Sequence, residues 1–125
     1  MAGKRIFIVD DEQEILDSLS RRLTQDGYEV ITATGGQEAV RKIRDSSPDL
    51  ILVDIVLPDI DGPDVVQRIR QAEPSLEIPV IFLSGIVSKE KDGYHSEIKV
   101  GGREYPAIAK PFPYEALRAL IQEAI

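Results

Sequence analysis

The sequence of 125 residues contains no cysteine. It can therefore form no disulfide framework and offers no thiol for catalysis, which makes a reducing cytoplasm its natural compartment. It also lacks any apolar run long enough to span a membrane. The basic start at residues 1–5 precedes only a short strand-like run, which is not the pattern of a signal peptide. We therefore expect a cytoplasmic protein without a membrane partner.

Positive charge is also scarce. The chain has 15 lysines and arginines against 22 acidic residues, a formal net charge of −7. Such a balance disfavours direct binding to the phosphate backbone of a nucleic acid. Hydrophobic residues make up 42% of the chain, which is enough for one core, and no repeat, low-complexity tract or linker interrupts it. We expect a single domain over residues 1–125.

Apolar runs alternate with helical patterns along the chain, which predicts repeated βα units and a parallel sheet. Most apolar positions of the expected first helix, Glu12 to Gln25, recur at helical spacing. The run from Leu50 to Val53 is apolar throughout, as expected of a strand buried on both faces. The other expected strands are Arg5–Val9, Tyr28–Thr32, Val80–Leu83 and Ala107–Ala109.

The segment from Gly85 to Glu104 breaks this alternation. A helix is expected there, but three glycines interrupt the segment. The residues from Tyr94 to Val100 alternate between apolar and polar instead, and Gly101-Gly102 can form a two-residue hairpin turn. We predict a short helix or loop followed by a β-arm.

Polar residues stand where the predicted strands end. Asp10 and Asp11 follow the first strand, Asp54 the third and Ser84 the fourth, and Lys110 follows the last. Open α/β sheets bind ligands at the carboxyl ends of their strands. We therefore expect these side chains to form one site.

Three carboxylates packed together repel one another unless a cation joins them. Mg²⁺ commonly binds through a few carboxylates, waters and a phosphate oxygen, and a carboxylate can accept a phosphoryl group. Asp54 is the better nucleophile candidate because it stands alone on the central strand. Lys110 and the Ser84 hydroxyl would pair with phosphoryl oxygens, since this reaction relies on positioning and on cations.

Several motifs, in order and at suitable spacing over the whole chain, resemble response-regulator receiver domains of two-component signalling. They are Val9-Asp10-Asp11-Glu12, Val53-Asp54, residues 57–62, Ser84-Gly85 and Lys110-Pro111-Phe112.

The resemblance implies that Asp54 is the phospho-acceptor. It implies that Asp11 binds Mg²⁺ directly and Asp10 through water, with the backbone carbonyl of Val56 as a third ligand. It also implies that Ser84 is the switch hydroxyl and Lys110 the phosphate-pairing lysine, with a cis peptide bond before Pro111.

The implied fold is flavodoxin-like: a five-stranded parallel sheet in the order 2-1-3-4-5, with helices on both faces and the last strand at an edge. Pro106 supports the edge position, because proline is tolerated mainly in edge strands. The implied partners are a histidine kinase or phosphotransfer protein and a downstream effector protein or domain. Such a domain is not an enzyme beyond its own phosphorylation and dephosphorylation. The β-arm would also offer an edge to a partner strand or to a second copy of the chain.

The sequence departs from the family at two places. The family usually has Tyr or Phe three residues before the lysine, where this chain has Ala107, while Tyr105 lies on the same strand face. The interval from Ser84 to Lys110 is 110 − 84 = 26 positions, a few more than is typical of the family. Both departures from the family pattern lie in or next to the segment with three glycines.

Two other functions compete with a phosphorylated receiver. A pseudo-receiver would act as a phosphorylation-independent interaction module, which the intact set of acids, Ser84 and Lys110 argues against. A phosphatase or phosphotransferase acting on external substrates often carries a second acid two residues after its nucleophile, where this chain has Val56. Asp11 could also be only a helix cap completed by Glu14, and Asp59 and Asp61 only turn formers.

Overall fold

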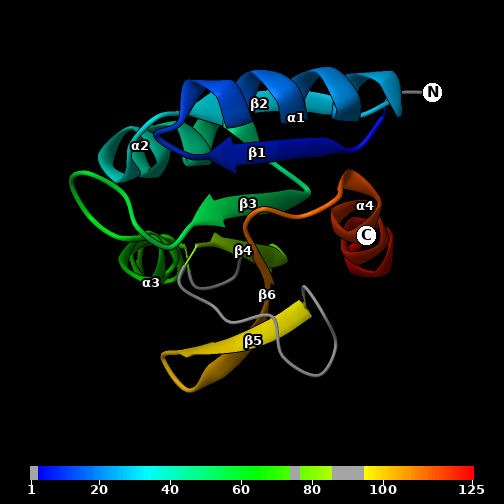
Figure 1. Cartoon of the computed structure of the whole chain (residues 1–125). Helices are drawn as coiled ribbons and strands as arrows, with labels where there is room; N and C mark the ends of the chain where they lie inside the picture. Colours follow the sequence, from blue (N-terminus) through cyan, green and yellow to red (C-terminus); the bar gives the residue numbers. More distant parts are fainter. Residues whose placement is uncertain (1–2, 74–76, 86–94) are drawn as a thin grey trace.

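The computed structural model describes residues 3–73, 77–85 and 95–125. Its centre is a six-stranded sheet in the order β2-β1-β3-β4-β6-β5 (Figure 1). Every neighbouring pair is parallel except β5 and β6, which are antiparallel. The strands are β1 (Arg5–Val9), β2 (Glu29–Ala33), β3 (Leu50–Asp54), β4 (Val80–Ser84), β5 (His95–Val100) and β6 (Arg103–Ala109).

Helices cover both faces of this sheet. They are α1 (Gln13–Gln25), α2 (Gly36–Ser46), α3 (Gly62–Ala72) and α4 (Tyr114–Ala124). Helices α1 and α4 pack on one face and α2 and α3 on the other, each with its own cluster of buried apolar side chains. None of the described helices is long and apolar enough to cross a membrane.

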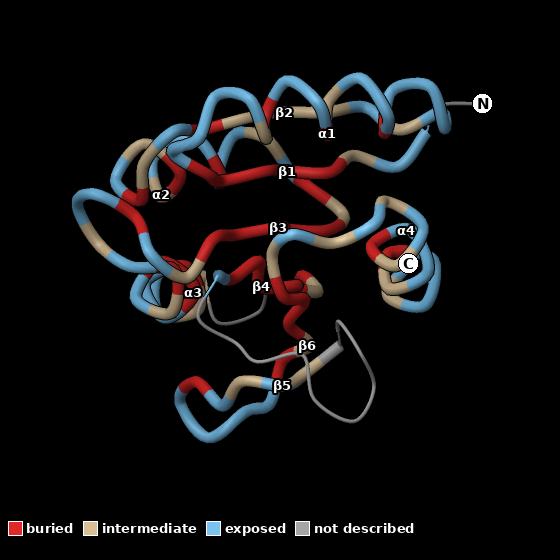
Figure 2. The backbone as a smooth tube through the Cα atoms, in the orientation of Figure 1, coloured by how far each residue is buried: buried red, intermediate tan, exposed pale blue. Residues whose placement is uncertain are grey.

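The central strands alternate between the two faces. Ile6, Ile8, Leu50 and Leu52 pack toward α1 and α4, while their immediate neighbours along each strand pack toward α2 and α3. All five residues of β3 and all five of β4 are buried, so these two strands form the centre of the core (Figure 2). The continuous apolar runs in the sequence arise because both faces of a central parallel strand are covered.

The predicted flavodoxin-like arrangement is confirmed, because the five parallel strands follow the expected order. The expectation that the last parallel strand lies at an edge is wrong. That strand, β6, lies between β4 and β5, so the edge belongs to a sixth strand, β5. Pro106 is tolerated at this place because β4 pairs with β6 only from Ala107 onward, and the proline lies outside that ladder.

The predicted hairpin is confirmed. Val100 pairs with Arg103, so the loop between β5 and β6 is the two-residue turn Gly101-Gly102. The φ angles of these glycines are 58° and 81°, the positive values that a type I′ turn requires at both central positions. A reversal this tight returns the chain along its own path and adds an antiparallel strand to the parallel sheet.

Candidate functional site

The carboxyl ends of the parallel strands bring the predicted polar residues together. Asp10 directly follows β1, Asp54 ends β3, Ser84 ends β4 and Lys110 follows β6. The register aligns these ends, because Asp54 pairs with Leu83, the residue before Ser84, and Ser84 pairs with Ala109, the residue before Lys110. Residues up to 100 positions apart in the chain therefore meet at the carboxyl end of the sheet.

Among the described residues, the buried polar or charged ones are Asp10, Asp54 and Ser84. Asp10 and Ser84 are 0% exposed and Asp54 is 6% exposed. Burying a carboxylate is costly unless a positive charge or hydrogen-bond donors accompany it. Two buried carboxylates at the carboxyl end of the sheet therefore make that end the candidate functional site.

The Lys110 ammonium joins the carboxylates. Its Nζ donates to Asp10 Oδ2 at 2.8 Å, to Asp54 Oδ2 at 2.9 Å and to Glu12 Oε1 at 3.2 Å. Backbone groups hold the other oxygens of the two aspartates: the N–H of Glu12 donates to Asp10 Oδ1 at 2.9 Å, and the N–H of Val56 donates to Asp54 Oδ1 at 3.2 Å. One cation thus faces three carboxylates, and the cluster keeps an excess of negative charge.

This environment shifts the pKa values of two members. Burial raises the pKa of the Asp10 carboxyl, and the hydrogen bonds from Lys110 and Glu12 oppose that rise only in part. Burial lowers the pKa of the Lys110 ammonium, but its hydrogen bonds to Asp10 and Asp54 outweigh burial, so its pKa lies above the ordinary value of 10.5. Lys110 is therefore positively charged throughout the physiological range.

Glu12 belongs to this cluster, although sequence reasoning assigned it no role in the expected site. Oxygens of Asp10, Glu12 and Asp54 lie within 4.8 Å of one another, close enough to share an ion. Glu12 is the N-cap residue of α1, where the chain leaves the strand end, and this position turns it toward Lys110. The signal was available in the sequence, because Glu12 directly follows the aspartate pair.

Asp11 is exposed and lies outside this group of three. The alternative in which Asp11 caps the first helix with Glu14 is wrong, because the N-cap is Glu12 and no side chain caps that end. Val56 lies two residues after Asp54 on the β3–α3 loop and is 58% exposed. The Ser84 carbonyl accepts from the N–H of Lys110 at 2.7 Å, which ties the ends of β4 and β6 together.

The loop after Asp54 is held from two sides. Asp61 caps α3 by accepting from the N–H of Asp64 at 3.0 Å. The Asp59 carboxylate accepts from the N–H groups of Gly36 and Gln37, at 2.8 and 2.9 Å, and so caps α2 from a distant loop. Thr34 has a residue type that often caps helices, but it does not cap α2, because the N-cap is Gly35 and the helix starts at Gly36. These bonds fix the loop that borders the site.

A scan against family models matches residues 6–122 to the response regulator receiver domain. The chain belongs to this family. The predicted cis peptide bond between Lys110 and Pro111, which followed from the family resemblance, is present.

Similar proteins include other receivers and longer regulators. The chain is 36% identical over 125 residues to the phosphate regulon transcriptional regulatory protein PhoB of Pseudomonas aeruginosa, covering 100% of this chain and 53% of PhoB. The chain thus spans about half the length of the curated relatives it matches. The structure of chemotaxis protein CheY4 of Vibrio cholerae matches with a TM-score of 0.80 and 28% identity, covering 99% of this chain and 100% of that one.

A third relative is the response regulator TrrA of Thermotoga maritima, solved in complex with Mg²⁺-BeF. It matches with a TM-score of 0.79 and 29% identity, covering 98% of this receiver and 99% of that chain. TrrA has also been solved in complex with the histidine kinase ThkA, with 30% identity and a TM-score of 0.79, covering 98% of each chain.

This receiver has a buried aromatic residue near the end of β4, at Tyr105 and not at position 107. Its ring is buried and packs edge-to-face on Phe82, with the centroids 5.8 Å apart, and Ala107 pairs with Phe82 across the sheet. Arg70 of α3 holds the ring by donating from Nε to the Tyr105 hydroxyl at 3.2 Å, with its guanidinium 5.7 Å from the ring centroid. Phe82 lies two positions before Ser84 on β4, so Tyr105 contacts the strand that carries the Ser84 hydroxyl.

Proposed function

We propose that this receiver takes a phosphoryl group from a histidine kinase or phosphotransfer protein onto Asp54, in the presence of Mg²⁺, and thereby changes its affinity for a downstream effector. The observation that carries the proposal is the contact of the Lys110 ammonium with both Asp10 and Asp54, the two carboxylates that are buried among the described residues. This combination matches the needs of an aspartyl phosphate.

The donor set fits a divalent cation. The carboxylates of Asp10, Glu12 and Asp54 lie together with one ammonium, so a hard oxygen-seeking ion would balance the remaining negative charge. We propose Asp10, Asp54 and the Val56 carbonyl as ligands, with Asp11 from the family resemblance and Glu12 as a further carboxylate within reach. When bound, Mg²⁺ would supply positive charge to the phosphoryl oxygens.

The chain's own residues would carry out the transfer. An Asp54 carboxylate oxygen attacks phosphorus, and the bond from phosphorus to the histidine nitrogen of the donor breaks. Lys110, which already bonds to Asp54 Oδ2, needs only a small movement to pair with a phosphoryl oxygen. The Ser84 hydroxyl, on the neighbouring strand end, would donate to a second phosphoryl oxygen and so move the backbone that follows it.

The relatives support these partners. TrrA, the relative solved with Mg²⁺-BeF and with a histidine kinase, covers nearly all of this chain. PhoB is a transcriptional regulatory protein about twice the length of the match. We propose a kinase partner, a cytoplasmic location and an effector on the same or another chain, with no direct contact between this domain and nucleic acid.

The test is phosphorylation by a small phosphodonor, followed by mass spectrometry of the intact chain. We expect labelling of the wild type with Mg²⁺, loss of labelling when the metal is chelated, and no labelling of Asp54→Asn. Asp17→Asn serves as the matched control, since it makes the same chemical change at an exposed position of α1.

Equal labelling of Asp54→Asn and the wild type would refute the acceptor. A wild type that neither labels nor binds Mg²⁺ in calorimetry would favour the phosphorylation-independent interaction module.

A further inference from the structure

The outermost strand of the sheet, β5, has an open edge in the described part of the chain. It is the last strand in the sheet order and pairs only with β6. Its inner face is anchored, because Val100 is buried and Ile98 packs against the core beside α3. A regular strand with one edge unpaired is a template for a further strand.

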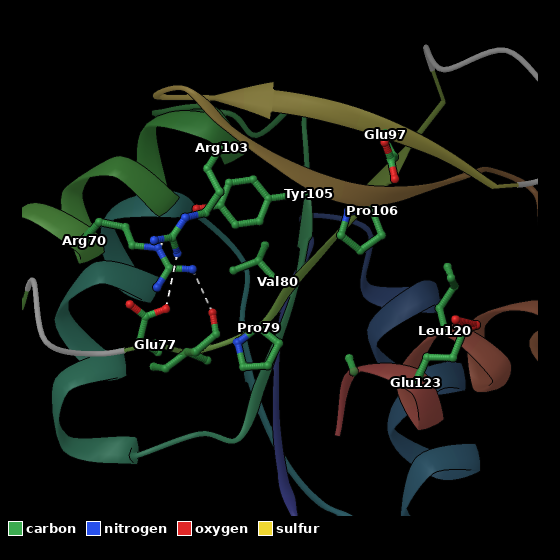
Figure 3. Close-up of a pocket in the computed structure, with 12 residues that line it drawn as sticks. Arg70, Glu77, Pro79, Val80, Glu97, Arg103, Tyr105, Pro106, Leu120 and Glu123 are labelled. Atoms are coloured by element: carbon green, nitrogen blue, oxygen red, sulfur yellow. Dashed lines mark hydrogen bonds and ion pairs between the residues drawn. The ribbon is translucent and has the colours of Figure 1, made fainter.

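Two opposite charges lie on the other face of β5. Glu97 and Lys99 are exposed and lie two residues apart, so their side chains are on the same face of the strand. Glu97 borders a cavity of about 500 Å³, together with Pro106 of β6 and Leu120 and Glu123 of α4 (Figure 3). Within the hairpin, Lys99 faces Glu104, whereas Glu97 faces the uncharged Pro106. The strand thus carries one carboxylate without a cation opposite it.

The turn fixes which backbone groups of β5 face the open edge. In a two-residue turn, the residues on either side of it are hydrogen-bonded to each other, here Val100 and Arg103. Hydrogen-bonded and non-hydrogen-bonded pairs then alternate along an antiparallel ladder. Counting back from Val100, Glu97 and Lys99 direct their N–H and C=O groups away from β6. The open edge therefore offers hydrogen bonds at the same two residues that carry the charges.

We propose that two copies of this chain pair through β5, antiparallel and centred on Ile98, to form one continuous sheet. A two-fold axis through this pair sets Glu97 opposite Lys99 of the partner subunit, and Lys99 opposite the partner's Glu97. The two charged pairs coincide with the hydrogen-bonded pairs, and Lys99 then lies between Glu104 and the partner's Glu97.

Charge selects this register over its neighbours. A two-fold pairing must keep each side chain on its own face of the sheet, so its centre can move only from residue to residue along the strand. A centre at Glu97 would set two glutamates opposite each other, and a centre at Lys99 would set two lysines opposite each other. Like charges directly opposite are destabilising. A lone lysine on an edge would guard it against pairing, but here the lysine has a complementary carboxylate two residues away.

The test is sedimentation velocity of the unphosphorylated chain at concentrations up to about 1 mM, the range in which small interfaces associate. We expect a concentration-dependent dimer. Glu97→Lys and Lys99→Glu should each weaken association by about 10- to 100-fold, since two exposed ion pairs become two repulsions. The double variant with both changes should restore association, because the charges are then exchanged between the same opposed positions. Arg21→Glu, the same type of change on exposed α1, should leave the dimer intact.

A second measurement checks the register and uses the absence of cysteine in the chain. Ile98→Cys places one thiol on each side of the two-fold axis, and oxidation should give a disulfide-linked dimer. Glu97→Cys should not cross-link, because its two copies lie about 8 Å apart at the Cα atoms.

Three outcomes would overturn the proposal. One is a wild type that stays monomeric over the whole range. Another is a dimer unaffected by either single charge reversal, which would place the interface elsewhere on the molecule. The third is a double variant that fails to restore association.

Discussion

The inner strands and the β5–β6 hairpin belong to one sheet but are built by different rules. Strands β1, β3 and β4 are covered on both faces, and every residue of β3 is buried. Along β5, residues that are at least partly buried alternate with exposed ones, and the strand ends at two glycines with positive φ. The inner strands are held by packing of side chains from distant segments, whereas the hairpin is specified by a local turn and by the pairing of neighbouring residues.

The comparison separates two roles. The tightly packed inner strands hold Asp10, Asp54 and Ser84 in fixed positions at their carboxyl ends. The hairpin adds exposed surface and an open edge, which suits contact with other chains. Our two proposals therefore place the chemistry at the carboxyl ends of the inner strands and the contact with a second copy at the β5–β6 hairpin.

The largest difference should appear in core truncations. Leu52→Ala, in the fully buried β3, should lower the free energy of unfolding by about 2–5 kcal/mol, because the cavity cannot collapse. Ile98→Ala, in the half-buried β5, should lower it by only about 1–2 kcal/mol. Urea unfolding at low micromolar concentration, where association does not contribute, measures both. Equal losses would show that the hairpin packs as firmly as the centre of the sheet.

A smaller effect should come from the turn. Gly102 has a φ of 81°, and a Cβ at this position would have none of the described atoms within 4 Å, so backbone strain alone penalises a side chain there. Gly102→Ala should cost about 1–2 kcal/mol in unfolding free energy. Gly102→Asn is the matched control and should cost less, because asparagine tolerates the left-handed conformation. If both variants were as stable as the wild type, the hairpin would not depend on its turn.

The smallest effect should be the pH response of the loop beside the site. The N–H groups of Gln37 and Gly36 lower the pKa of the Asp59 carboxyl from 3.8 to about 2. The carboxylate therefore stabilises the fold above its unfolded pKa, and this contribution is lost as the pH falls through the folded pKa, between about pH 4 and pH 2.

Melting temperatures of the wild type and Asp59→Asn, compared at steps across this interval, test the assignment. The wild type should be the more stable above the interval, and the difference should shrink toward its acid end. The cost of Gly102→Ala should not change with pH, since the turn has no titratable group. A difference in melting temperature between wild type and Asp59→Asn that stayed constant with pH would show that the Asp59 charge does not stabilise the start of α2.

The local signals in the sequence predicted most of the elements. The apolar runs gave the parallel strands to within a few residues, and the Gly101-Gly102 pair with the alternation before it gave the hairpin. The edge position of the last strand was wrong because Pro106 indicates only that one ladder is absent at that residue, and that ladder is the one to β4. The sequence did not reveal how α2 is capped, because the N–H groups at its start donate to Asp59, 22 residues or more away in the chain.

The sequence by itself determined the order of strands and helices and the residue types at each strand end, because these depend on period, turn chemistry and chain connectivity. Only the tertiary structure decided which charges meet. It joined Lys110 to Asp10 and Asp54 and added Glu12 to the cluster. It also left β5 as the edge with Glu97 and Lys99 exposed. The physical reason is that hydrogen bonds and ion pairs act over a few ångströms. The number of residues between two side chains does not determine the distance between them, which is set only when the strands pair in a defined register.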